Sequence, residues 1–298
     1  MRRVSYRWFL LWVVSLVLAT QALTTCGGSS TLERAQATGT LRVGYANEVP
    51  YSYWDAAAAE LTGEAPTIAR AVLAELGISH LEGVLVQFQD LVSGLRAGQF
   101  EAIAAGLDLQ PELCHQVAFS NPTARVGTAL LVAAGNPQAL HSYEDLRDRP
   151  ATLGVVAGTT EQDYAETLDL PRGRLAVLPD VPSAVAAVRS GRIDAYGGLA
   201  LTVQAWVDQE GRGELERAAP FTPPRWQGRP LEHYQAFAFR QQDQDLVQAF
   251  NRHLQAFIGT PAHQRQVRPF GFTAQELPGE VTAEALCQGT VPGAQGLK

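Results

Sequence analysis

Lysine is almost absent from this chain. Lys298 is the only lysine among 298 residues, so arginine supplies nearly all of the basic side chains. Acidic residues outnumber basic ones by 30 to 23, which leaves a net charge of −7 with histidine neutral. No run of basic residues occurs after residue 8. Because a nucleic-acid partner needs a basic surface to meet its phosphates, we expect none here.

Long apolar runs are missing as well, apart from one near the N-terminus. A basic start over residues 2–7 precedes an apolar stretch over 8–19, which is too short to span a membrane and is typical of a signal peptide. We therefore expect residues 1–25 to be a signal peptide and residues 26–39 to be a tether. The chain is then exported, to the periplasm or the outer face of the cytoplasmic membrane.

Cys26 ends a segment that resembles the lipobox of bacterial lipoproteins. Leu23 precedes the cysteine by three residues, and Gly-Gly-Ser-Ser follows it. The resemblance implies that Cys26 is acylated and that the membrane is reached only through this lipid. The alternative is an ordinary signal peptide with an incidental cysteine, since Thr25 replaces the Gly, Ala or Ser usual before it.

Cysteine is scarce, with three in the whole chain. If Cys26 carries a lipid, Cys114 and Cys287 remain in an oxidising compartment, where an even remainder favours a disulfide. Two buried free thiols are the alternative.

Catalytic and metal-binding motifs are absent. The sequence contains no Gly-x-Ser-x-Gly elbow, no phosphate-binding glycine loop, no Cys-x-x-Cys and no His-Glu-x-x-His. The six histidines are not paired at helical spacing, so we expect no metal site, no cofactor and no catalytic residue.

One phrase occurs twice. Residues 96–107 read Arg-Ala-Gly-Gln-Phe-Glu-Ala-Ile-Ala-Ala-Gly-Leu, and residues 189–199 read Arg-Ser-Gly-Arg-Ile-Asp-Ala-Tyr-Gly-Gly-Leu. In both copies an apolar helical run stops at a glycine and is followed by a short strand. Two such units are too few for a solenoid, so we interpret them as two α/β lobes with a ligand cleft between them.

Two long apolar strands, expected over 127–133 and 234–239, bracket the second copy and would carry the chain between the lobes. We assign residues 40–132 and 237–290 to a discontinuous first lobe. Residues 133–236 form the second. Alternating strands and helices in each lobe predict parallel sheet units.

The loops that follow the predicted strands hold the candidate binding residues, because open α/β sheets bind ligands there. In the first lobe these are acidic and aromatic residues, which suit a delocalised cation: Glu48, Tyr51, Tyr53, Trp54, Phe88 and Asp108. In the second lobe Gly158-Thr159-Thr160-Glu161 lies between a strand and a helix, where hydroxyl and amide groups suit a carboxylate. The two sets together predict a pocket for a small zwitterion.

Each of these residues also has an ordinary structural explanation. Thr159 and Thr160 fit a helix N-cap, Tyr51 and Phe88 fit core aromatics, and acidic loop residues are often merely solvated. The functional interpretation depends on their convergence at strand ends in two similar lobes.

With these residues identified, the chain from residue 41 to about 287 resembles the bacterial extracellular solute-binding proteins of family 3. These are type II periplasmic binding proteins of the polar amino acid class. The motifs are Leu41-Arg42-Val43-Gly44, residues 91–106, Pro111-Glu112-Leu113 and Gly158-Thr159-Thr160. Gly259-Thr260-Pro261 and Phe270-Gly271-Phe272 most resemble the ectoine/hydroxyectoine-binding proteins of that family.

The resemblance implies a ligand-binding role for residues at matching positions: Glu48, Tyr51, Phe88, Gly106 and Glu161. At three further places the chain departs from the pattern, and in the first of them Leu107-Asp108 follows Gly106 where the family often has an aromatic residue. Leu113 stands where the family has an arginine that clamps the ligand carboxylate, and Leu199 stands where many amino acid binders have an aspartate for the ammonium. A ligand carboxylate would then rely on Thr159, Thr160 and backbone amides, or on another arginine such as Arg125, or the ligand is more cationic than ectoine.

The resemblance implies an α/β type II fold and a monomeric ABC-importer component that delivers a small solute to a permease and its ATPase. Ectoine or hydroxyectoine is the first expected ligand, and a polar or basic amino acid is the alternative. A periplasmic enzyme on this fold, such as a cyclohexadienyl dehydratase, is a third possibility. A sensor input domain is disfavoured because no apolar span follows the fold.

Overall fold

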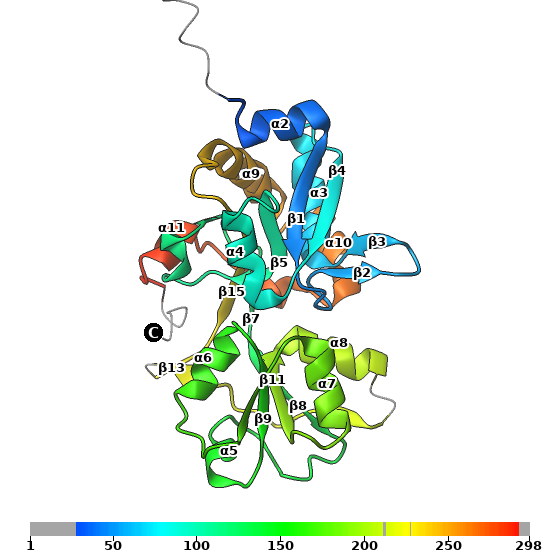
Figure 1. Ribbon diagram of the computed structural model, residues 1–298, viewed down its shortest axis with the longest axis vertical. Helices are drawn as coiled ribbons and strands as arrows, with labels where there is room; N and C mark the ends of the chain where they lie inside the picture. Colours follow the sequence, from blue (N-terminus) through cyan, green and yellow to red (C-terminus); the bar gives the residue numbers. More distant parts are fainter. Residues whose placement is uncertain (1–27, 211–212, 227, 292–298) are drawn as a thin grey trace, which may run out of the picture.

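The structure of the protein is a computed structural model that describes residues 28–210, 213–226 and 228–291. The predicted signal peptide and Cys26 lie outside these residues. The chain forms two α/β lobes, one above the other in Figure 1, with β7 and β15 near the junction. No helix of the described part has both the length and the apolar character needed to cross a bilayer.

The first lobe is built on a sheet with the order β4-β1-β5-β15-β6, and β7 pairs with β15 beside this path. Strands β1, β4 and β5 are parallel, and β15 runs antiparallel to β5. The strands are β1 (Thr40–Tyr45), β4 (His80–Leu85), β5 (Ala102–Asp108), β6 (Ala118–Phe119), β7 (Ala124–Val126) and β15 (His233–Phe239). A hairpin of β2 (Tyr53–Asp55) and β3 (Glu60–Thr62) projects from this lobe.

Helices cover both faces of this sheet, and each face has its own apolar core. One core includes residues of α2 (Thr31–Thr38), α3 (Glu64–Glu75), α9 (Gln244–Phe257) and α10 (Pro261–Val267). The other includes residues of α4 (Leu91–Arg96) and α11 (Ala283–Cys287). Short 3₁₀ turns are η1 (Phe88–Asp90), η2 (Leu113–His115), η3 (Arg268–Phe270) and η4 (Ala274–Glu276).

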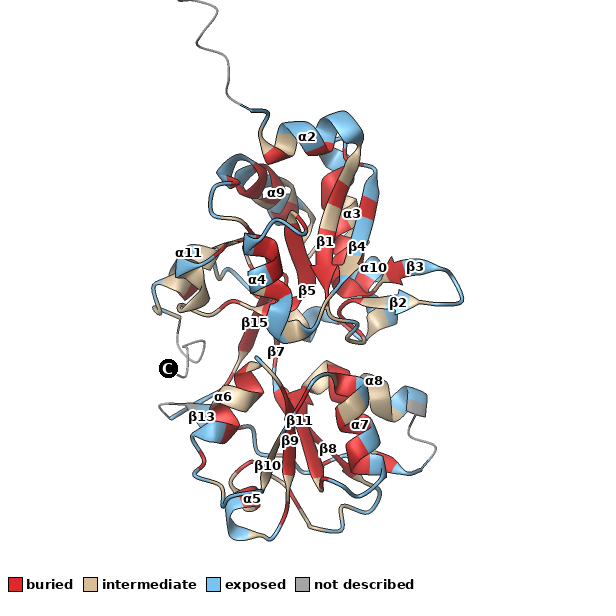
Figure 2. Cartoon of the chain, in the orientation of Figure 1, coloured by how far each residue is buried: buried red, intermediate tan, exposed pale blue. Residues whose placement is uncertain are grey.

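The second lobe repeats the plan with the strand order β10-β9-β11-β8-β12. Its strands are β8 (Thr128–Ala133), β9 (Leu153–Val156), β10 (Leu175–Leu178), β11 (Ala195–Leu199) and β12 (Leu215–Arg217). Helices α5 (Asp145–Asp148) and α6 (Thr160–Glu166) pack on one face, and α7 (Val181–Arg189) and α8 (Ala200–Glu210) on the other. Strands β13 (Arg225–Trp226) and β14 (Arg229–Pro230) form a small hairpin. In both lobes the central strands are buried and the outer faces of the helices are exposed (Figure 2).

The sequence repeat corresponds to α4–β5 in the first lobe and to α7–β11 in the second. In each copy the glycine after the helix, Gly98 or Gly191, has a left-handed φ, of 76° and 69° respectively. Only glycine adopts this conformation without strain, which explains why the helix stops at the same point in both copies.

The two crossovers lie elsewhere than predicted. Residues 124–126 pair with β15 in the first lobe, whereas residues 128–133 pair with β11 and β12 in the second, so the first crossover is at Gly127. Residues 128–132 therefore belong to the second lobe and residues 233–236 to the first. Only Gly127 separates β7 from β8, and hydrophobicity alone does not show that the two strands join different sheets.

The predicted tether over 26–39 is also corrected in its second half, where residues 31–38 form helix α2. Ser30 accepts a hydrogen bond from the Glu33 amide and Glu33 returns one to the Ser30 amide, which is a capping box. Thr31 Oγ1 donates to Asp243 Oδ1 over 2.7 Å and joins this helix to the segment before α9.

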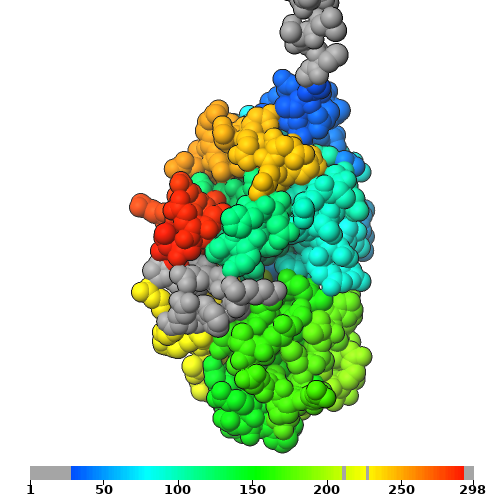
Figure 3. All heavy atoms as spheres, turned by 60° about the vertical axis from the view of Figure 1, so that its left-hand side comes forward, coloured from blue at the N-terminus to red at the C-terminus, as the bar shows by residue number. Residues whose placement is uncertain are grey.

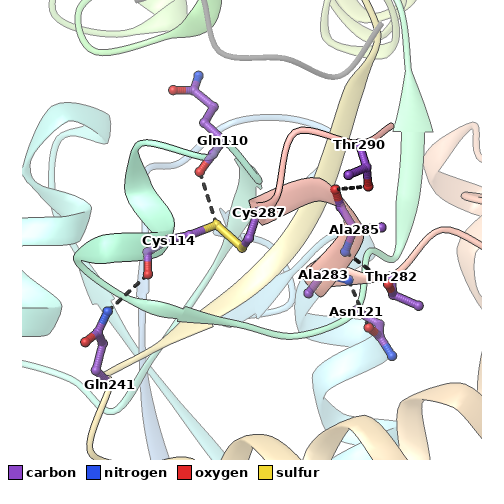
Figure 4. Close-up of a disulfide and its surroundings, with 9 residues drawn as sticks. All are labelled: Gln110, Cys114, Asn121, Gln241, Thr282, Ala283, Ala285, Cys287 and Thr290. Atoms are coloured by element: carbon purple, nitrogen blue, oxygen red, sulfur yellow. Dashed lines mark hydrogen bonds between the residues drawn. A yellow bond between two sulfur atoms is a disulfide. The ribbon is translucent and has the colours of Figure 1, made fainter. Parts of the chain in front are cut away.

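A disulfide between Cys114 and Cys287 joins η2 to α11 (Figure 4). Around it, Gln241 Nε2 donates to the Cys114 carbonyl over 3.0 Å, and the Ala283 amide donates to Asn121 Oδ1 over 3.1 Å. The bond ties the C-terminal segment to the loop that carries Leu113.

Candidate functional site

A cavity of about 260 Å³ lies between the lobes. Both lobes supply the walls of this cavity. The two lobes are closely apposed in Figure 3. The walls come from strand-end loops of the first lobe and from β9, α6, α7 and β11 of the second. They are formed by Glu48, Phe88, Gly106, Leu107, Asp108, Gln110, Leu113, Val156, Gly158, Thr159, Thr160, Glu161, Gln162, Asp163, Glu166, Val181, Tyr196, Gly198 and Leu199.

The ends of the repeated phrase meet at this cavity. Asp108 is the last residue of β5 and Leu199 the last of β11, and both line the walls. Each strand is parallel to one neighbour, β5 to β1 and β11 to β9, and ligands of open α/β sheets bind at the carboxyl ends of such strands.

Three hydrogen bonds cross from one lobe to the other at this cavity. Thr202 Oγ1 donates to Glu48 Oε1 over 2.7 Å. Thr160 Oγ1 donates to Asp108 Oδ2 and accepts from Gln110 Nε2, both over 2.6 Å. These contacts hold the two lobes in a closed arrangement.

Gly158 permits this close approach. Its φ is +82°, and a Cβ at this position would stand 3.0 Å from the Cα of Gln89 in the opposite lobe. Any side chain here would therefore press against the backbone of the first lobe.

His233 is a site residue that the sequence did not reveal. It begins β15 at the second crossover, and it is only 2% exposed. Its Nδ1 lies 2.6 Å from Asp108 Oδ2, and its Nε2 lies 3.7 Å from Glu161 Oε1. Burial disfavours the imidazolium, but the two carboxylates outweigh burial and raise the pKa of His233 to about 9. The side chain is therefore protonated at neutral pH and links acids of both lobes.

Burial also raises the pKa of two carboxyl groups of the cavity, those of Glu48 and Glu161. It raises the pKa of Glu48 to about 7, with Thr202 opposing the shift and the charges of Glu161 and Asp108 adding to it. The pKa of Glu161 is raised by burial, although His233 opposes that shift. Glu161 Oε1 is buried and has no hydrogen-bond partner. A positively charged ligand beside these groups would favour their ionised forms.

Most of the predicted binding residues line the cavity: Glu48, Phe88, Gly106, Asp108, Leu113, Thr159, Thr160, Glu161 and Leu199. Tyr51 does not. It is fully buried, packs edge-on against Phe272 with ring centroids 5.5 Å apart, and supports Gly106 from behind. Tyr53 and Trp54 lie in β2, away from the cavity walls, and Trp54 is half exposed.

Sequence reasoning missed several polar and aromatic contributors, namely Gln110, Tyr196, Thr202 and His233. Gln110 follows the end of β5 by two residues, and Tyr196 lies inside β11, three residues before its end. Both are therefore near strand ends where candidates were sought. Thr202 lies in α8 and His233 at a crossover, and neither position carries a sequence signal. Among the described residues, no group of three or more His, Cys, Asp or Glu side chains is placed to hold a metal ion.

Comparison with known proteins agrees with this architecture. Residues 41–269 match the model of the bacterial extracellular solute-binding proteins, family 3. The chain belongs to that family. A probable amino-acid ABC transporter periplasmic-binding protein of Sinorhizobium fredii (strain NBRC 101917 / NGR234) is 32% identical over 92% of this chain and 90% of its own length.

Solved structures show the same fold. EhuB in complex with hydroxyectoine has a TM-score of 0.76 and 32% identity, over 86% of this chain and 97% of EhuB. An ancestral amino acid-binding protein, described as a precursor of cyclohexadienyl dehydratase, has a TM-score of 0.69 and 25% identity, over 81% and 99% of the two chains. The fold is the type II periplasmic-binding fold, and as a family member the chain binds a solute rather than transforming it.

Proposed function

We propose that this family 3 protein captures a small cationic or zwitterionic solute and presents it to the permease and ATPase of an ABC importer. One observation carries the proposal: Glu48, Asp108 and Glu161 face one small cavity whose described lining contains no arginine or lysine. Phe88 and Tyr196 add aromatic surface, which suits a cationic group. Hydroxyectoine and ectoine are the first ligands to test, because EhuB is the neighbour with hydroxyectoine bound.

Closure of the two lobes would generate the form that the importer recognises. A ligand shifts an open–closed equilibrium only through contacts that differ between the two forms. Here the bonds from Thr202 to Glu48 and from Thr160 to Asp108 exist only when the lobes meet. A cation that bridges acids of both lobes would add to them.

A basic amino acid is the second candidate. A relative in Escherichia coli (strain K12), named ABC transporter arginine-binding protein 1, is 24% identical over 60% of this chain and 69% of its own length. The acidic cavity suits a guanidinium group as well as it suits ectoine.

The proposed setting is the periplasm or the outer face of the cytoplasmic membrane, with a monomer held by a lipid on Cys26. Metabolic labelling with an alkynyl fatty acid tests the anchor. We expect label on the full chain and none on Cys26→Ser, and equal labelling of the two would refute lipidation.

Isothermal titration calorimetry of the purified protein tests the ligand class. The panel is ectoine, hydroxyectoine, glycine betaine, arginine, glutamine and glutamate. We expect saturable binding of at least one cationic or zwitterionic solute and no heat with glutamate. If no cationic or zwitterionic solute binds, or if glutamate alone binds, the proposal is wrong.

A further inference from the structure

Three of the groups that the sequence offers to a ligand carboxylate are already engaged within the protein: the Gly158 amide and the hydroxyls of Thr159 and Thr160. The Gly158 amide donates to Gln162 Oε1 over 2.8 Å. Thr159 Oγ1 donates to the Val156 carbonyl over 2.8 Å, so its hydroxyl hydrogen does not face the cavity. Thr160 Oγ1 donates its hydrogen to Asp108 Oδ2.

Asp108 therefore supplies a carboxylate of the protein itself at this point. Its Oδ2 accepts a hydrogen bond from Thr160 Oγ1 of the second lobe and another from His233 Nδ1 of β15, each over 2.6 Å. One hydroxyl and one imidazolium make a good receptor for a single carboxylate oxygen, because charge-assisted hydrogen bonds are stronger than neutral ones. The Asp108 carboxylate already accepts hydrogen bonds from both of these groups.

No arginine or lysine of the described cavity lining is left to pair with a ligand carboxylate. Leu113 presents an apolar side chain at the wall, and among the described residues the lining holds neither arginine nor lysine. Arg125 lies elsewhere: its Nη1 is 3.7 Å from Glu232 Oε1, and it lines a separate depression beside the crossovers.

Acceptors for a cation do remain. Glu161 is 3% exposed and lines the cavity, and its Oε1 accepts no hydrogen bond, although it lies 3.7 Å from His233 Nε2. Glu48 lines the same cavity from the other lobe and receives one hydrogen bond, from Thr202. A second carboxylate brought in by a ligand would meet Asp108, Glu161 and Glu48 at short range, where like charges repel.

We propose that the cleft takes a small organic cation without a carboxylate, an amine or guanidinium compound, because Asp108 occupies the place that a ligand carboxylate would take. This inference rests on the proposed function and narrows it. It predicts that a decarboxylated cation binds more tightly than the amino acid from which it derives, and more tightly than ectoine.

Matched ligand pairs test the inference on the unmodified protein. Arginine and agmatine share a guanidinium and differ in the carboxylate, and so do lysine and cadaverine with their amines. Calorimetry should show the decarboxylated member of a pair binding more tightly, by about tenfold or more. If the amino acid binds as tightly or more tightly, the inference is wrong while the proposed function stands. If neither pair binds and the wider panel is also silent, both are wrong.

Variants of Asp108 test the stated cause. Asp108→Ser vacates the receptor formed by Thr160 and His233, so the ratio of the arginine to the agmatine dissociation constant should fall by about tenfold. Asp108→Asn keeps an acceptor oxygen in place and should leave more of that ratio intact. Glu166→Gln is the control, because it removes a carboxylate from the lining of the same cavity, on the opposite lobe, without exposing Thr160. An equal change of the ratio in Asp108→Ser and Glu166→Gln would overturn the receptor argument.

Discussion

Thr202 Oγ1 donates a 2.7 Å hydrogen bond to Glu48 Oε1, and the two residues belong to opposite lobes. Thr202 is fully buried at the start of α8, and Glu48 lies in the loop after β1. This hydrogen bond thus couples closure of the cleft to the ionisation of Glu48, an acidic residue of the cavity wall.

Thr202→Val removes this bond and keeps the shape of the side chain. We expect ligand affinity to fall about tenfold, because hydrogen bonds to charged groups contribute ~1.5–3 kcal/mol. Calorimetry measures the change, and Thr222→Val, an exposed position in the same lobe, serves as the control. An unchanged dissociation constant in Thr202→Val would show that the bond does not contribute to closure.

Gly158→Ala should impair closure, because its Cβ would stand 3.0 Å from the Gln89 backbone. Gly173→Ala is a close control. Gly173 lies in the same lobe with a φ of +84°, and a Cβ there would meet no atom within 4 Å, so both variants carry the strain of a left-handed alanine but only one meets the opposite lobe. Small-angle X-ray scattering with ligand should show a larger radius of gyration for Gly158→Ala alone. Similar compaction of the two variants would contradict the steric argument.

Affinity for a guanidinium ligand should fall as the pH drops from 8 to 6. Burial raises the pKa of Glu48 to about 7, so its carboxylate is largely ionised at the upper pH and largely protonated at the lower. The guanidinium keeps its charge throughout. We expect a loss of up to about tenfold, from titrations at several pH values. In Glu48→Gln the affinity should be lower and the pH dependence smaller, and an equally steep dependence in that variant would exclude Glu48 as its source.

Glu64→Gln should stabilise the protein at alkaline pH. Glu64 is 1% exposed in the first turn of α3, and burial raises its pKa to about 8 despite the opposing Thr123 hydroxyl. A folded pKa above the unfolded value means that stability is greatest below about pH 4.5 and is lost as the pH rises through 8. Urea unfolding at pH 8.5 should show a gain of ~2–4 kcal/mol for the variant, and at pH 5 almost none. Glu75→Gln, at the exposed end of the same helix, is the control, and a gain independent of pH would refute the titration of Glu64.

The sequence indicates the cavity between the lobes because the strand-end rule is local. Short apolar runs followed by polar residues mark the ends of β1, β4, β5 and β9, and most of the candidates at these ends line the cavity, although Tyr51, Tyr53 and Trp54 do not. Tyr51 was predicted to bind by the same rule, but the chain turns after Glu48 and buries the ring beneath Gly106. An aromatic residue at a strand end can support a wall as well as form one.

His233 and Gly127 show what the sequence does not reveal. The contact of His233 with Asp108 joins residues 125 positions apart, and no spacing pattern marks it. The change of sheet at Gly127 is set by the partners of β7 and β8, which belong to different lobes. The Ser30–Glu33 capping box, by contrast, is visible in the sequence, and it would have predicted helix α2 in place of a tether.

The most direct test of the account is a pair of calorimetric titrations at pH 8, one with agmatine and one with glutamate. We predict saturable one-to-one binding of agmatine that weakens in Glu161→Gln, and no binding of glutamate. Binding of glutamate together with silence toward agmatine would contradict it, because a cavity that selects an anion does not have the electrostatics described for Glu48, Asp108 and Glu161.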